Sequence, residues 1–217
     1  MPYAYKNDRS KYLVRKLSQK KFIRPYLSQL RKHHVETYEH SLRVARLAVD
    51  LGYENHLPKH IIKLLGYAGL LHDFGKTRID AEILSKPGKL SPEEYAEIKM
   101  HPRYGFLALK DERFNDIRKI VTAHHEFKKY GYPRSNARRK YIRFPFPERR
   151  KQENQTISLL AQIIAAADMY DALAVPRAYQ SDFQNTKIEE ILETNFIGNK
   201  VLVIQLLVRR PFVESMI

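Results

Sequence analysis

The stretch PKHIIKLLGYAGLLHDFGK, residues 58–76, predicts an apolar helix that is followed at its end by the polar pair His72-Asp73. Pro58 is predicted to occupy the first helical position, where its missing N–H removes no hydrogen bond. The apolar run 61–71 is too short to span a bilayer, so this helix is expected to lie buried among others. His72 and Asp73 therefore come at the end of a buried element, where an imidazole and a carboxylate both require partners.

Apolar residues recur at helical spacing along most of the chain, and no period-2 strand series is found, which predicts an all-α helical bundle. Gly52 is predicted to stop the helix that begins at Val35. Ser91-Pro-Glu-Glu94 is a capping box that predicts one helix towards Leu109. The run 201–204, VLVI, is open to a strand reading by composition. The expected helices are 35–51, 58–72, 91–109, 116–126, 152–173, 188–195 and 200–208, with further helix in 1–34 and loops near 76–90 and 127–151.

The composition describes a globular chain of 217 residues with a net charge of +15. This length fits one domain, or one domain with a short appendage. The chain has no cysteine, which excludes disulfides, thiolate metal ligands and cysteine nucleophiles. Any metal must therefore be held by His, Asp or Glu, and these ligands suit manganese, iron, zinc, nickel or cobalt.

The sequence predicts neither a membrane-spanning helix nor a secretory signal. The most apolar stretches, 61–71 and 201–208, are too short to cross a bilayer. The N-terminal residues MPYAYKNDRSKY contain no apolar signal-peptide core. The chain is therefore expected to be cytoplasmic.

The positive charge is concentrated in two segments. Residues 1–34 contain ten Lys or Arg and one acid, and residues 134–151 contain eight and one. Such segments attract nucleic acid, anionic lipid or a phosphorylated ligand, although a solvated basic surface explains them equally well. We expect 1–34 to form a basic helical appendage on the main body, and 134–151 to be a basic insert beside the functional site.

Several of the nine histidines fall in apolar helices, together with buried acidic positions. His40 lies four residues after Glu36, so both side chains share one helix face. His101 and the pair His124-His125 lie in two later helices, and Asp168 interrupts the apolar run IIAAADMYDAL. If these helices pack as a bundle, their polar groups converge, and bound cations would offset the cost of burying them.

Six to eight nitrogen and oxygen ligands are enough for two metal ions or three. A pair of divalent ions can activate water near neutral pH and neutralise the phosphoryl oxygens of a phosphodiester. Lys76, just after the His72-Asp73 pair, is placed to neutralise a phosphate oxygen. Two such ions would therefore give a direct mechanism for phosphodiester hydrolysis.

Each of these residues also has an ordinary interpretation. A single helical histidine is more often a core or surface residue than a ligand, and His33, His34, His56 and His60 are assigned to that group. Asp168 could cap a helix or pair with an arginine. Glu36 could be a surface residue near Arg43 or Lys32.

The order of these motifs resembles the HD superfamily of metal-dependent phosphohydrolases, and more specifically its HD-GYP branch. The resemblance covers roughly residues 35–200 of the chain. The matching pieces are LLHDFGK at 70–76, HPRYG at 101–105, AHHE at 123–126, GYP at 131–133 and ADMYDAL at 167–173.

The resemblance implies an all-α catalytic domain over residues 35–217 that hydrolyses cyclic di-GMP to the linear dinucleotide or GMP. It implies two or three metal ions, often iron or manganese, at the active site. Asp73 and Lys76 would act in catalysis, and Lys76, Tyr132 and Arg177 would contact the substrate. The implied metal ligands are Glu36, His40, His72, Asp73, His101, His124, His125 and Asp168.

The chain departs from the family pattern around the GYP motif. The segment HHEFKKYGYP is one residue shorter than usual, and Lys128-Lys129-Tyr130 replaces an Asp-Gly. A basic run follows Pro133, and Gln162 stands where the family usually has an arginine. Because 34 residues cannot hold the usual sensor or receiver domain, we expect a stand-alone catalytic module.

Three functional hypotheses remain open at this point. The first is a phosphodiesterase for cyclic di-GMP or a related cyclic dinucleotide. The second is an HD phosphohydrolase acting on another nucleotide or phosphoester. The third is a weakly catalytic metal- or nucleotide-binding module whose basic segments contact nucleic acid or an anionic surface.

Overall fold

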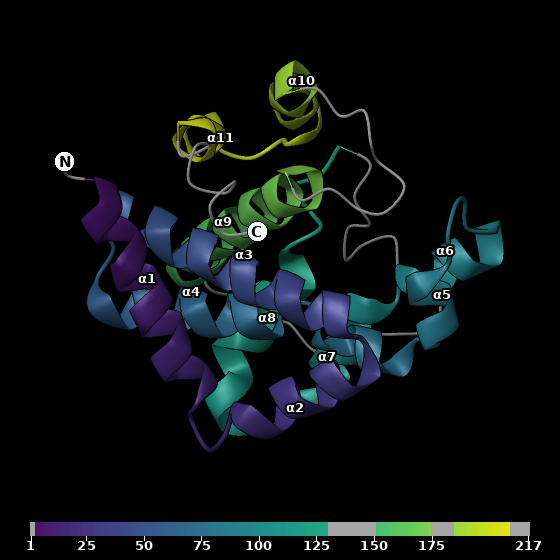
Figure 1. Cartoon of the computed structure of the whole chain (residues 1–217). Coiled ribbons are helices and arrows are strands. Elements are labelled where there is room, and N and C mark those ends of the chain that lie inside the picture. Colours follow the sequence, from purple (N-terminus) through teal and green to yellow (C-terminus); the bar gives the residue numbers. More distant parts are fainter. Residues whose placement is uncertain (1–2, 130–150, 175–184, 209–217) are drawn as a thin grey trace.

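The computed structural model describes residues 3–129, 151–174 and 185–208, in which all regular structure is helical apart from one isolated bridge (Figure 1). This confirms the predicted all-α fold. The elements are α1 (Tyr3–Ser18), α2 (Arg24–His33), α3 (Val35–Glu54), α4 (Lys59–Leu71), η1 (Phe74–Arg78), α5 (Ala81–Ser85), α6 (Pro92–Ile98), α7 (His101–Ala108), η2 (Glu112–Phe114), α8 (Asn115–Ala123), α9 (Lys151–Ala174), α10 (Asn185–Asn195) and α11 (Lys200–Leu207).

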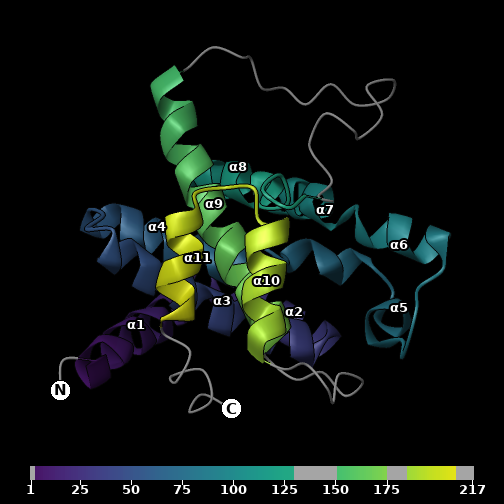
Figure 2. The same ribbon diagram turned by 90° about the horizontal axis from the view of Figure 1, so that it is seen from above.

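Helices α3 and α4 form the middle of the bundle (Figure 1). Their residues Leu51 and Leu65 belong to a buried apolar cluster that also contains side chains of α8, α9, α10 and α11. Val49 and Leu70 of the same two helices belong to a second cluster, shared with α1, α2 and α8. Seen from above, α10 and α11 lie over α9 (Figure 2). The two clusters therefore cover opposite sides of the α3–α4 pair.

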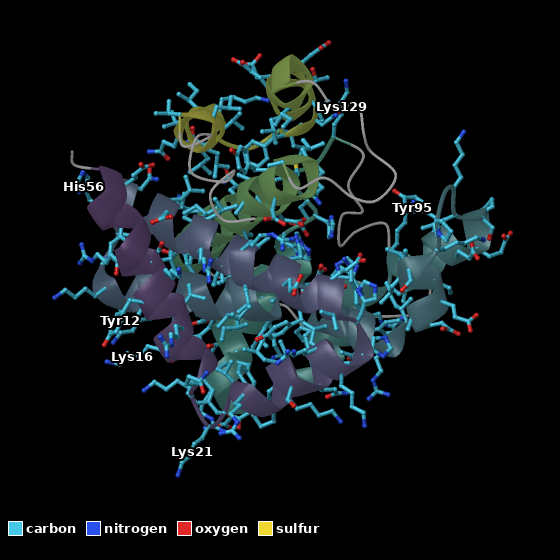
Figure 3. The ribbon with its side chains drawn as sticks, viewed as in Figure 1. Tyr12, Lys16, Lys21, His56, Tyr95 and Lys129 are labelled. Carbon is cyan, nitrogen blue, oxygen red and sulfur yellow. The ribbon has the colours of Figure 1, made fainter. Side chains whose placement is uncertain are left out.

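The N-terminal helices are part of the second cluster. Leu17 of α1 and Leu27 and Leu30 of α2 are buried there against residues of α3 and α4. The basic residues from Arg9 to Lys32 are exposed, and Figure 3 shows Lys16 and Lys21 projecting away from the bundle. Helices α1 and α2 therefore share a core with α3 and α4. The predicted division of the chain at residue 34 stays a prediction.

The contact between α3 and α4 corrects two predictions of helix ends. Helix α3 does not stop at Gly52 but continues to Glu54. A Cβ atom at Gly52 would lie 2.9 Å from Leu65 Cδ1, so this glycine permits close packing against α4 rather than ending the helix. Pro58 is the N-cap of α4, one residue before the predicted position.

The capping box is formed as predicted, and the strand alternative near the C-terminus is wrong. Ser91 Oγ accepts a hydrogen bond from Glu94 N, and Glu94 Oε2 accepts one from Ser91 N at 2.7 Å. Residues 201–204 lie inside helix α11, whose N-cap Asn199 accepts from Val201 N at 3.0 Å. Part of the predicted loop 76–90 is also helical, as η1 and α5.

The helix predicted from Ser91 towards Leu109 is two helices, α6 and α7, with a turn between them. Pro102 explains the break, because it has no N–H to donate to the carbonyl of Ile98 and its ring crowds that carbonyl. His101 is therefore the first residue of α7, not a mid-helix residue as predicted. The break lets the His101 ring turn back towards the preceding helix.

Helix α9 is long and apolar enough, by length and composition, to cross a membrane over Gln155–Ala174, with mean hydropathy 1.4. This stretch is longer than either of the two apolar runs singled out in the sequence. In the bundle 67% of this window is buried, and the window contains the buried carboxylates Asp168 and Asp171. These properties are those of a core helix that carries part of a site.

Candidate metal centre

Five elements bring seven histidine and aspartate side chains together inside the bundle. All seven are at most 8% exposed. They form three overlapping groups of three residues, and within each group one ligand atom per residue lies within 4.8 Å of the other two, close enough to share a metal ion. The groups are His40, His72 and Asp73; His72, His124 and Asp168; and His101, His124 and His125.

Asp73 lies between two sets of histidines. Its Oδ2 atom is 3.4 Å from His72 Nε2 and 3.7 Å from His40 Nε2. Its Oδ1 atom is 3.2 Å from His101 Nε2, and His101 Nε2 is 3.2 Å from His125 Nε2. One carboxylate thus directs its two oxygens to separate groups of imidazole nitrogens, which is the arrangement of a bridging ligand.

Backbone carbonyls fix the orientation of three of these rings. Nδ1 of His72 donates to Gly69 O at 2.8 Å, and Nδ1 of His124 donates to Val121 O. Because a carbonyl only accepts, Nδ1 carries the proton, and the Nε2 lone pair is left for another partner. The Nε2 atoms of His72 and His124 are buried and make no hydrogen bond. Buried, unbonded imidazole nitrogens beside two carboxylates fit a divalent metal ion.

A hydrogen bond from Nδ1 to a backbone carbonyl also orients His101, at the break between α6 and α7. Nδ1 of His101 donates to Ile98 O at 2.8 Å. This is the carbonyl that Pro102 leaves without its helical donor. The His101 ring therefore supplies the donor that Ile98 O lacks at the helix break, and the same hydrogen bond fixes the orientation of the ring.

His40 is held by a carboxylate outside the predicted set. Its Nδ1 atom donates to Asp171 Oδ2 at 2.7 Å, which directs Nε2 towards Asp168 Oδ1 at 3.0 Å. Arg43 fixes Asp171 through two further hydrogen bonds, Nε to Oδ1 at 2.8 Å and Nη2 to Oδ2 at 3.1 Å. Asp171 is thus a positioning residue for His40, and Arg43 holds it in turn.

Replacing Asp171 with asparagine should weaken metal binding by about 10- to 100-fold, because the buried acceptor that orients His40 loses its charge. Titration of the metal-free protein with Mn²⁺ against a chromophoric chelator measures this affinity. Asp116→Asn is the matched control, since Asp116 is exposed on α8 and pairs with Lys119. Equal affinities in the Asp171 variant and the control would contradict the positioning role.

Two lysines contact the carboxylates of the site. Lys76 Nζ lies 2.7 Å from Asp73 Oδ2, and Lys128 Nζ lies 2.7 Å from Asp168 Oδ2. Each lysine side chain is 23% exposed, whereas the side chains of the two aspartates are 3% and 10% exposed. Both lysines therefore lie nearer the protein surface than the carboxylates that they contact.

The electrostatics leave most of these groups in the form that metal ligation needs. Burial would raise the pKa values of Asp73 and Asp168, but lysine and histidine neighbours lower both well below the ordinary value. Burial lowers the pKa of His101 to about 4, and lowers those of His124 and His125 as well. These carboxylates are ionised and these imidazoles neutral near pH 7. His40 differs: despite its burial, hydrogen bonds to Asp168 and Asp171 raise its pKa to about 9.

The remaining predicted site residues have different positions. Glu36 is exposed and belongs to none of the three ligand groups found in the described residues. Tyr132 and Arg177, like most of the basic insert 134–151, lie outside the described residues. His124 and His125 follow the last residue of α8, Ala123, instead of lying inside the helix.

The histidines assigned to ordinary roles are outside the site. His33 bonds to Ile79 O at 2.8 Å, and His34 accepts from a backbone N–H as the N-cap of α3. His56 and His60 are exposed. No described ligand group includes any of the four.

The fold and the site together define a class: helical bundles that hold a cluster of histidines and aspartates suited to divalent metal ions. The comparison with known families places the chain within this class. Residues 37–173 match the HD domain family, so the chain belongs to that family.

Curated relatives are phosphodiesterases of cyclic dinucleotides. A cyclic di-GMP phosphodiesterase of Pseudomonas aeruginosa is 34% identical over 157 residues, 71% of this chain and 34% of the relative. A 3′3′-cGAMP-specific phosphodiesterase of Vibrio cholerae is 34% identical over 130 residues, 59% of this chain and 25% of the relative. The chain spans about a third or less of the length of these relatives.

A solved structure has the same fold. The HD domain of the L. monocytogenes phosphodiesterase PgpH, in complex with cyclic-di-AMP, matches with a TM-score of 0.50 and 20% identity. The match covers 88% of this chain and 84% of that one. The helical bundle is thus the HD fold that the motif order indicated.

Proposed function

We propose that this chain is a metal-dependent phosphodiesterase that hydrolyses a cyclic dinucleotide, such as cyclic di-GMP, to the linear dinucleotide or GMP. The position of Asp73 carries the proposal. Its two oxygens face separate histidine groups, at 3.2 Å from His101 Nε2 and 3.4 Å from His72 Nε2. A carboxylate placed in this way can hold two divalent ions close together, as two-metal phosphoesterases require.

The protein side of the mechanism follows from the contacts. His40, His72 and Asp168 would hold one ion, His101, His124 and His125 the other, and Asp73 would contact both. Such ions supply Lewis-acid activation of water and neutralise charge on the phosphoryl group. Iron or manganese is the proposed metal, because nitrogen and carboxylate ligands without thiolates suit both.

Lys76 is proposed to contact the phosphate. Its ammonium group lies on Asp73 and its side chain is partly exposed, so a short movement would bring it to an anionic substrate. The buried rings exclude bulk water from the inner wall of the site, where electrostatic interactions are correspondingly stronger. The names of the curated relatives support a cyclic dinucleotide as the substrate.

A substrate panel tests the proposal. The protein is purified anaerobically and loaded with Mn²⁺ or Fe²⁺. It is then incubated with cyclic di-GMP, 3′3′-cGAMP, cyclic di-AMP and a simple aryl phosphodiester, and the products are analysed by mass spectrometry. A linear dinucleotide or mononucleotide from a cyclic dinucleotide supports the proposal. Hydrolysis of the aryl ester alone, or none with metal bound, would overturn it.

A further inference from the structure

Lys128 forms an ion pair with a carboxylate of the candidate site, although the motif order assigns it no role. It comes three residues after His125, in the segment where Lys128-Lys129-Tyr130 replaces the usual Asp-Gly. Its Nζ atom lies 2.7 Å from Asp168 Oδ2. We propose that Lys128 is a second phosphate-binding residue of the site. It contacts Asp168, whereas Lys76 contacts Asp73. The inference rests on the proposed function and concerns how its substrate is held.

The backbone around Lys128 is fixed by the C-terminal helices. Lys129 N donates to Asn195 O at 2.7 Å, and Ile197 N donates to Phe127 O at 2.9 Å. These bonds flank an antiparallel bridge between Lys128 and Phe196. Phe196 is fully buried, and Phe127 packs against the same core cluster. The segment is therefore held against the turn between α10 and α11. This fixes the backbone from which the Lys128 side chain reaches Asp168.

The charges in the site point to an anion as the partner of this lysine. Without metal, Lys76 pairs with Asp73 and Lys128 pairs with Asp168. Asp171 is already paired with Arg43. When divalent ions take the carboxylates, both ammonium groups are left beside a cationic centre. Two positive charges at a partly exposed edge favour a phosphodiester anion.

The two lysines sit on different carboxylates. The oxygens of Asp168 are divided, because Oδ1 faces His40 Nε2 at 3.0 Å whereas Oδ2 faces Lys128. In contrast, Lys76 approaches from η1 on the Asp73 side. A cyclic dinucleotide carries two phosphates, so two separate lysines suit it better than one.

The test measures phosphate and metal affinity separately from turnover. Inorganic phosphate is titrated into the Mn²⁺-loaded protein by calorimetry, and Mn²⁺ into the metal-free protein. Lys128→Met should bind phosphate about tenfold more weakly. It should bind Mn²⁺ several-fold more tightly, because a competing positive charge is removed. Lys128→Arg should keep most of the phosphate affinity.

Lys129→Met is the matched control, since it removes the same charge one residue further on, from an exposed side chain. It should leave both affinities unchanged. Wild-type phosphate affinity in Lys128→Met would overturn the inference, even if Mn²⁺ bound more tightly, because Lys128 would then be only a carboxylate partner. Equal losses in both variants would overturn it as well. If phosphate binding depends on Lys128 but no cyclic dinucleotide is cleaved, the proposed function fails and this inference stands.

Discussion

Replacement of Asp73 by alanine is expected to lower phosphodiester hydrolysis by at least about a thousandfold, equivalent to about 4 kcal/mol of transition-state stabilisation. Asp73 contacts both histidine groups, through Oδ1 at 3.2 Å from His101 and Oδ2 at 3.4 Å from His72. Its loss would remove a ligand from both metal positions at once. Product formation by mass spectrometry and metal content by elemental analysis check the two effects together.

Folding has to be separated from chemistry in this experiment. Asp73 is buried and pairs with Lys76, so the alanine variant also loses a buried ion pair. Asp73→Asn keeps the shape of the side chain and should lose activity and metal with a smaller change in melting temperature. Asp116→Ala removes an exposed carboxylate from α8 and should change neither quantity. Full activity in either Asp73 variant would exclude the two-metal mechanism.

Local sequence features were enough to predict much of the ligand set. His72 and Asp73 end an apolar helix, and Asp168 interrupts another, so each is a polar group where burial is costly without a partner. The structure places all of these side chains in one cluster. The helical periodicity that predicted the bundle also predicted which elements carry them. Their roles as ligands stay a prediction until a metal is measured.

The position of His101 differs from the one that the predicted helix 91–109 gave it. The capping box at Ser91 predicts the start of one long helix. Pro102 is the available signal against that interpretation, because proline in a helix interior removes a bond and crowds the preceding turn. The break places His101 at the start of α7, where its ring bonds to Ile98 O.

Other contacts have no local signal in the sequence. The Asp171 carboxylate meets His40 across 131 positions, and Lys128 meets Asp168 across 40. The second contact also depends on the pairing of residues 127–129 with 195–197, which only the docking of α10 and α11 produces. Spacing within a helix shows which residues share a face, but not which distant residue that face meets.

Gly75→Ala is expected to be among the most damaging small substitutions in the chain. A Cβ atom at this position would overlap the carbonyl oxygen of His101 and would lie 2.5 Å from Gly105 N. Both contacts are with backbone, so no side-chain rotation relieves them, and η1 must move away from α7. We expect a loss of about 3 kcal/mol in the free energy of unfolding. Thermal and urea denaturation measure it.

The same displacement should reach the site, because Gly75 lies two residues after Asp73 and its clash is with the backbone of His101. The 3.2 Å contact between Asp73 Oδ1 and His101 Nε2 would lengthen. A misplacement of about 1 Å can cost on the order of 100-fold in rate. Mn²⁺ affinity and hydrolysis should therefore fall together in the folded fraction of Gly75→Ala.

Two glycine controls separate the clash from the general cost of adding a methyl group. At Gly88 an added Cβ meets nothing within 4 Å, and the positive φ of 91° should cost about 1 kcal/mol with no change in metal affinity. At Gly105, on the other side of the contact, a Cβ would lie 3.3 Å from Val121 Cγ1 and should have an intermediate effect. If Gly75→Ala melted like Gly88→Ala and bound Mn²⁺ normally, the close approach of η1 and α7 could not be what positions His101 against Asp73.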